Sequence, residues 1–151
     1  MKMIRLYTFA IVVSLSLAFT SAAIGKDKDD EDSEDDVTIE KVSLVRETPD
    51  KFESVKSFKP TDIFGVLVKL SEAKTGTHVK AIWTVVNAGG MENKKILEKE
   101  VVITPEALKG VKEPTRIDFT LTHDNPYPTG DYKTEIYLNG ELTETVEFEI
   151  K

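Results

Sequence analysis

Hydrophobic and polar residues alternate along the chain from Val37 to the C-terminus, in short runs that turn-forming residues separate. Side chains of a β-strand point to opposite faces in turn, so this two-residue period is typical of strands with one buried face. We therefore predict an all-β domain of seven antiparallel strands in two packed sheets. The predicted strands are Val37–Val45, Ile63–Leu70, His78–Val86, Ile96–Ile103, Arg116–Thr122, Asp131–Tyr137 and Glu141–Ile150.

The parity of the apolar positions predicts which side chains face the core. In the first strand the apolar residues are odd-numbered before Glu40 and even-numbered after Lys41, which predicts a β-bulge or a kink near these two residues. The predicted inward residues of three further strands are Phe64, Val66, Val68 and Leu70, then Val79, Ala81, Trp83 and Val85, and then Ile117, Phe119 and Leu121.

The connection between the last two strands contains Asn139-Gly140, a sequence that favours a two-residue hairpin turn. That register would place Ile136 opposite Thr143 and would mix core and solvent faces. We therefore predict a three-residue loop, Leu138-Asn139-Gly140, that pairs Ile136 with Leu142 and Tyr132 with Val146. Gly140 is expected to have a positive φ in this loop.

Two other connections depart from the alternation. In Thr104–Gly110 a threonine cap, a proline at the first helical position and a terminal glycine predict one helical turn that crosses between the sheets. In Glu47–Lys59, the apolar residues Phe52, Val55 and Phe58 are expected to cover an open end of the core.

The N-terminus has a different composition. Residues 1–23 combine a basic start, an apolar run and a small-residue exit at Ser21-Ala22-Ala23, which predicts a secretory signal peptide and a secreted or periplasmic protein. An uncleaved anchor is the alternative, although the apolar run is shorter than the ~20 residues that a bilayer requires. Residues 24–36 are rich in acidic side chains and predict a disordered spacer, with weak cation binding as a second possibility. The predicted domain then occupies residues 37–151.

Composition excludes several kinds of site. The chain has 151 residues, no cysteine and a formal charge of −7, so disulfides and thiolate metal sites are excluded and a general affinity for nucleic acid is disfavoured. Phosphate loops, zinc-ligand spacings and dinucleotide fingerprints are also missing from the sequence. We expect no cofactor and no metal.

Two residues carry a resemblance to a known fold. Trp83 in the third predicted strand and Tyr132 at the start of the sixth resemble the inter-sheet tryptophan and the tyrosine corner of immunoglobulin and fibronectin type III sandwiches. The resemblance implies that the Tyr132 hydroxyl bonds to backbone just upstream. Thr134 stands where an immunoglobulin domain has a disulfide cysteine, so the disulfide form is excluded. The segment Gly76–Trp83 also resembles sandwich domains of uncharacterised bacterial secreted proteins.

Only His78 and His123 could serve as neutral-pH bases or nitrogen metal ligands, and we expect both to be solvated surface residues. No nucleophile-elbow pattern marks a serine. The sequence therefore predicts no catalytic residues, and the chain is not expected to be an enzyme.

The most distinctive predicted loop is Asn125-Pro126-Tyr127-Pro128-Thr129, in which two prolines stiffen the backbone and Tyr127 has no place in the alternation. A stiff aromatic loop loses little entropy on binding, so it is a candidate binding loop; the alternative is an entry turn that only positions Tyr132. The loop is also similar to the Asn-Pro-x-Thr-Gly loop of chagasin-like cysteine-protease inhibitors. Tyr127-Pro128 is an insertion relative to that motif, and the family's Arg-Pro-aromatic loop is missing.

Two further surface features complete the sequence-based hypothesis. Asn87–Asn93 is expected to be a mobile loop because of its paired glycines, and Ile82, Val86 and Tyr137 are expected to form an outward apolar patch. We expect a noncatalytic exported module that contacts another extracytoplasmic protein. A carbohydrate-binding module, which would expose coplanar aromatic rings, is the alternative.

Overall fold

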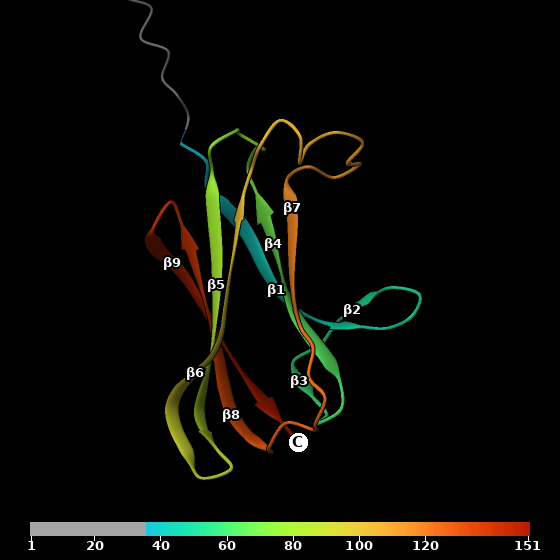
Figure 1. Ribbon diagram of the computed structural model, residues 1–151, viewed down its shortest axis with the longest axis vertical. Helices are drawn as coiled ribbons and strands as arrows, with labels where there is room; N and C mark the ends of the chain where they lie inside the picture. Colours follow the sequence, from blue (N-terminus) through green and yellow to red (C-terminus); the bar gives the residue numbers. More distant parts are fainter. Residues whose placement is uncertain (1–35) are drawn as a thin grey trace, which may run out of the picture. The chain divides into compact units, whose positions relative to one another are not determined.

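The computed structural model describes residues 36–151, which fold almost entirely into β-strands (Figure 1). The seven predicted strands are all present, and two short ones are added between the first and second. The predictions of a signal peptide and, except for Asp36, of the acidic spacer lie outside the described residues. The strands are β1 (Ile39–Glu47), β2 (Phe52–Ser54), β3 (Ser57–Phe58), β4 (Ile63–Leu70), β5 (His78–Ala88), β6 (Met91–Val102), β7 (Arg116–Leu121), β8 (Gly130–Leu138) and β9 (Glu141–Ile150).

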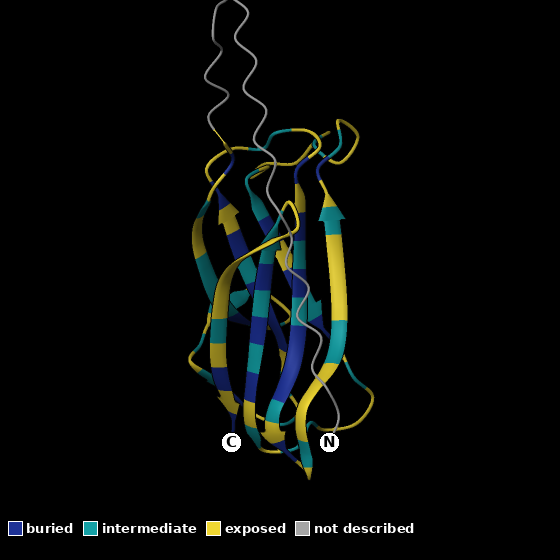
Figure 2. Ribbon diagram, turned by 90° about the vertical axis from the view of Figure 1, so that its left-hand side faces the viewer, coloured by how far each residue is buried: buried dark blue, intermediate teal, exposed yellow. Residues whose placement is uncertain are grey.

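The strands form two sheets, ordered β2-β1-β4-β7 and β3-β9-β8-β5-β6. All neighbouring pairs are antiparallel except β3 and β9. Figure 2 shows buried and exposed bands alternating along the strands. Every residue of the three predicted inward sets is buried, so the two-sheet sandwich inferred from parity is confirmed. Residues 36–151 contain no helix with the length and apolar character needed to cross a membrane.

Both landmark residues lie in the core. Trp83 is 2 % exposed and its ring meets Phe119 of the opposite sheet edge-on, with 6.3 Å between ring centroids. Tyr132 is 1 % exposed, and its hydroxyl donates a hydrogen bond of 2.7 Å to the carbonyl of Pro128. The tyrosine corner expected from the resemblance is therefore present.

Two local predictions about the backbone are confirmed. The β1–β4 ladder shifts register between Ile39 and Lys41, as the phase change in the first strand indicates. The Thr104 hydroxyl accepts a hydrogen bond from the backbone of Ala107, and the Leu108 N–H bonds to the Thr104 carbonyl, which together form one capped helical turn. Gly110 ends this turn with a φ of 74°. The segment carries the chain from β6 in one sheet to β7 in the other.

The predicted three-residue loop between β8 and β9 is wrong. Leu138 pairs with Glu141, so Asn139-Gly140 is a two-residue turn with positive φ at both positions. A bulge at Thr143 then shifts the register, and Tyr132 pairs with Phe148 on the core face. The bulge restores the alternation that an uninterrupted two-residue hairpin would break.

The segment between β1 and β4 covers the core only in part as predicted. Phe58 is buried and packs against Phe64 and Phe148, with centroid separations of 5.1 and 5.3 Å, and Val55 packs against the same cluster. Phe52 does not join the core, because β2 pairs with the edge of β1 and the Phe52 ring lies 5.7 Å from the Arg116 guanidinium.

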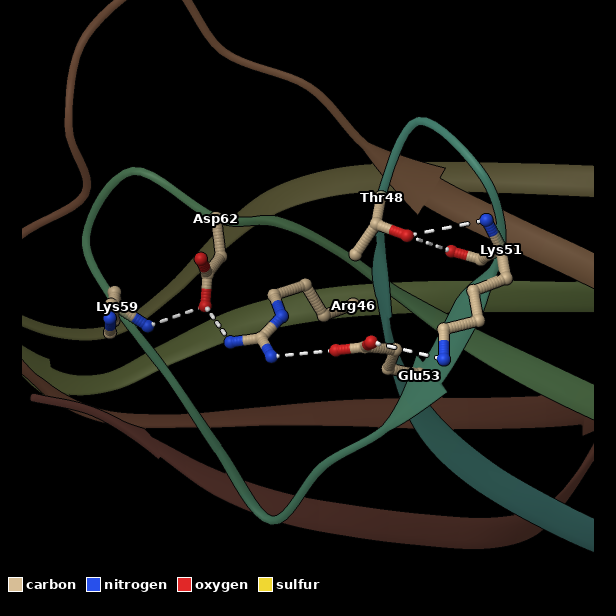
Figure 3. A network of polar contacts seen from close by, with 6 residues as sticks. All are labelled: Arg46, Thr48, Lys51, Glu53, Lys59 and Asp62. Carbon is tan, nitrogen blue, oxygen red and sulfur yellow. Dashed lines mark hydrogen bonds and ion pairs between the residues drawn. The ribbon is translucent and has the colours of Figure 1, made fainter.

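Polar contacts around Arg46 hold this segment in place (Figure 3). The Arg46 guanidinium donates to Glu53 on β2 at 2.8 Å and to Asp62, just before β4, at 3.5 Å. Asp62 also accepts the backbone N–H of Lys59 at 2.9 Å. These contacts connect β2 and the turn after β3 to the end of β1.

Candidate functional site

The predicted binding loop is anchored by its aromatic residue. The Tyr127 ring is half-buried, with its centroid 4.9 Å from that of Phe64 and 4.1 Å from that of His123. Its backbone N–H donates to the carbonyl of Pro60 at 2.9 Å. Burial raises the pKa of Tyr127, with a further contribution from the neighbouring Tyr132. Tyr127 therefore fixes the loop to the end of the core.

The other members of the loop surround this anchor. Asn125, Pro126 and Thr129 are exposed, whereas Pro128 is half-buried and its carbonyl receives the Tyr132 hydroxyl. The loop thus positions Tyr132, as expected for an entry turn, and its remaining residues are exposed to solvent.

The segment Asn87–Asn93, predicted as a mobile loop, is instead the end of a long hairpin. The β5–β6 ladder continues to the pair Ala88 and Met91, which leaves Gly89-Gly90 as a two-residue turn. A Cβ built on Gly89 would lie 2.8 Å from the side chain of Pro128, so the turn packs directly on the Tyr127 loop. The hairpin end and the start of β8 lie at the same end of the sandwich (Figure 1).

A groove of about 280 Å³ lies between the hairpin and the loop. Tyr127 forms one side of it, and Lys94 and Lys95 are also part of its lining. We call it the Tyr127 groove. Its remaining lining is apolar and consists of Val85, Met91 and Ile96.

A β-bulge shapes the groove. Trp83 pairs with Leu97 and Thr84 with Lys95, so Ile96 is an extra residue in β6. Lys95 donates to Glu98 at 2.9 Å, and this hydrogen bond lowers the pKa of the Glu98 carboxyl. No carboxylate partner of Lys94 is found within residues 36–151.

The groove lies beside an open sheet edge. β6 is the last strand of its sheet, so among the described strands one side of its twelve-residue backbone has no ladder partner. The neighbouring edge, that of β7, is partly capped because the Lys99 ammonium of β6 donates to the carbonyl of Thr120. This edge was not evident from the sequence, because Met91–Asn93 were assigned to a loop and Lys94-Lys95 to no strand.

Neither histidine is among the residues that line the Tyr127 groove. His78 is about half exposed and its Nδ1 lies 3.0 Å from a carboxylate oxygen of Glu100. His123 is only half exposed, and its Nδ1 is buried without a hydrogen-bond partner in the described part of the chain. The expectation of a solvated His123 is therefore wrong, because its ring packs on Tyr127. Residues 36–151 contain no cluster of three or more metal-ligating side chains.

Charged side chains separate the residues of the expected apolar patch. Ile82, Val86 and Tyr137 are each half-buried, and Ile82 pairs with Glu98 on one side and Glu135 on the other. The Lys80 ammonium lies 5.1 Å from the Tyr137 ring centroid. The large hydrophobic side chains that are exposed in the described region are all aliphatic, so it offers no platform of exposed coplanar aromatic rings.

Comparison with known proteins identifies the fold. No family model matches the chain, and no curated protein matches it in sequence. Among solved structures, the chain is similar to an immunoglobulin-like protein from Pseudomonas aeruginosa, with a TM-score of 0.53 and 15 % sequence identity. The match covers 79 % of this chain and 99 % of the other. It shows an immunoglobulin-like β-sandwich, in agreement with the sequence-based resemblance.

Proposed function

We propose that this immunoglobulin-like chain is an exported, noncatalytic binding module that holds an extended segment of another protein along the edge of β6. The observation that carries the proposal is the position of the Tyr127 groove directly beside the open β6 edge. Export is supported by the signal-peptide pattern of residues 1–23.

The two features supply complementary parts of peptide recognition. An open strand edge offers backbone N–H and C=O groups to an added strand, and adjacent pockets select its side chains. The apolar lining of Val85, Met91 and Ile96 suits an aliphatic or aromatic side chain of the partner. Lys94 and Lys95 favour an acidic residue next to it.

The rigidity of the site also supports a binding role. Tyr127 is fixed by ring contacts on the core side, and the Gly89 turn packs on Pro128. A site whose walls are already ordered loses less conformational entropy when it binds. Immunoglobulin-like domains typically act without catalysis, and neither histidine lines the groove.

The proposal can be tested by site-specific photo-crosslinking in the exported fraction of the native host. A photoreactive amino acid replaces Glu92 on β6 or, as a matched control, Glu144 on β9; both are exposed glutamates on strands. We expect a defined protein adduct from position 92 and not from position 144. The charge reversals Lys94→Glu and Lys95→Glu together are expected to abolish this adduct, whereas Lys56→Glu leaves it intact.

Equal adducts at the two positions would contradict the proposal. An adduct from position 92 that survives the double charge reversal would contradict the role of the Tyr127 groove. Circular dichroism of each variant verifies that the fold is retained.

A further inference from the structure

Three basic residues lie side by side across the other sheet. Lys41 on β1 pairs with Lys69 on β4, and Lys69 pairs in turn with Arg116 on β7. Directly paired residues of neighbouring strands project from the same face, and adjacent strands lie about 4.8 Å apart. The three side chains therefore form a row on the outer face of this sheet, which we call the basic row.

The basic row lowers the stability of the unliganded protein, because like charges placed opposite each other on adjacent strands repel. Lys69 is partly neutralised by Glu40 at 2.7 Å, and Arg116 by Glu113 at 3.1 Å. Within residues 36–151, Lys41 has no carboxylate within ion-pair distance. This concentration of positive charge occurs on a chain whose formal charge is −7.

The basic row borders a concavity of about 310 Å³. Besides the three cations, its lining consists of the hydroxyl-bearing residues Ser43 and Ser54 and the apolar residues Val45, Phe52 and Leu67. The Arg116 guanidinium lies over the Phe52 ring, which limits the directions in which it can point. Cationic, hydroxyl and apolar groups thus meet within one shallow site at the small end of the range of ligand pockets.

We infer that this concavity binds an acidic sugar unit, with the basic row holding its carboxylate and the serines bonding its hydroxyls. The inference is independent of the β6 edge, because it concerns the opposite sheet.

The strand pairing favours a sugar over an acidic peptide. β4 at Lys69 is paired with strands on both sides, so its backbone has no free edge to which an extended peptide could add. Recognition over Lys69, in the middle of the basic row, must therefore use side chains. An acidic sugar presents a carboxylate, several hydroxyls and an apolar ring face within one small unit, which matches the three kinds of group in the lining.

The test uses the full chain, a trimer of galacturonic acid and, as the uncharged control ligand, a trimer of galactose. Amide chemical shifts are followed by NMR during titration at low salt. We expect the acidic trimer to shift resonances around Lys41, Lys69 and Arg116, and the neutral trimer to leave them unchanged. Lys41→Ala and Lys69→Ala are each expected to weaken binding by about twofold to fivefold, as for single exposed ion pairs. Lys56→Ala, at an exposed lysine elsewhere, leaves the affinity unchanged.

Three results would overturn the inference. These are no shifts at millimolar acidic trimer, equal shifts with the neutral trimer, or shifts that map away from the basic row. The inference would also be overturned if an Asp- and Glu-rich peptide bound at the basic row and the acidic trimer did not. That result would assign the site to acidic protein segments.

Discussion

At the scale of single residues, Thr134 is notable because its hydroxyl is buried in the core without a hydrogen bond among the described residues. It stands on β8 two residues after the corner tyrosine, where disulfide-bonded immunoglobulin domains have a cysteine. Its side chain is fully buried, and no partner for its hydroxyl lies within the described residues. A buried hydroxyl without a hydrogen bond costs free energy that a methyl group of the same shape does not.

We therefore predict that Thr134→Val raises the free energy of unfolding by about 1 kcal/mol. Urea denaturation followed by Trp83 fluorescence measures the change. The companion variant Thr134→Ser retains the hydroxyl and leaves a small cavity, so it should be less stable than the parent. A destabilised Thr134→Val protein would show that the hydroxyl has a partner.

A second residue-scale prediction concerns pH. The hydrogen bond from Arg46, with help from Lys51, lowers the pKa of Glu53 below its ordinary value of 4.5. Because the folded pKa is the lower one, this stabilisation is complete above pH 4.5 and is lost as pH falls through the folded pKa. Glu53→Gln should thus reduce stability slightly at pH 7, and this effect should diminish as pH falls below 4.5. Glu47→Gln, at an exposed glutamate without an ion pair among the described residues, should show no such pH dependence.

At the scale of elements, the junction between the Tyr127 loop and β8 depends on Gly130. Its φ is 145°, and a Cβ at this position would lie 2.3 Å from the carbonyl oxygen of Asn87. Side chains cannot occupy such a space unless β5 and β8 separate. The close approach of these two strands therefore requires a glycine.

Gly130→Ala is predicted to destabilise the protein by more than about 3 kcal/mol, because backbone strain and a steric clash add. The control is Gly140→Ala, where φ is also positive at 89° but the space around the Cβ is open. That variant should lose only about 1 kcal/mol. Equal losses in urea denaturation would contradict the close packing of β5 on β8.

The alternation of apolar residues predicted the strands correctly wherever one face of the strand is buried and the other is exposed to solvent. It failed for the first five residues of β6, since Glu92, Lys94 and Lys95 lie on an edge where neither face is fully covered. The final hairpin failed for another reason: parity was applied to an uninterrupted ladder, whereas a bulge at Thr143 resets it. A bulge requires no distinctive residue, so its position is hard to infer from one sequence.

The candidate site was predictable only in part for the same reasons. Tyr127 was identified because it did not fit the alternation, and its loop does form one wall of the groove. The opposite wall depends on the extended β5–β6 hairpin and on the bulge at Ile96, which follow from strand register. The basic row likewise becomes visible only when the pairing of β1, β4 and β7 is known.

At the scale of the whole molecule, the described sandwich presents two surfaces of different chemistry. One sheet ends in the open β6 edge beside the Tyr127 groove, and the other presents the basic row on its outer face. Charged residues and bulges on edge strands normally oppose unspecific pairing between sheets. The lysines and the Ile96 bulge of β6 thus oppose self-association through this edge.

The central claim is that the β6 edge is open in the free protein, and residue-resolved amide hydrogen exchange tests it most directly. Along β6, amides that bond to β5 should exchange slowly, whereas the alternate amides that face away from β5 should exchange at rates close to those of an unprotected chain. Slow exchange at both sets of β6 amides would mean that the edge is already covered, and it would contradict the account.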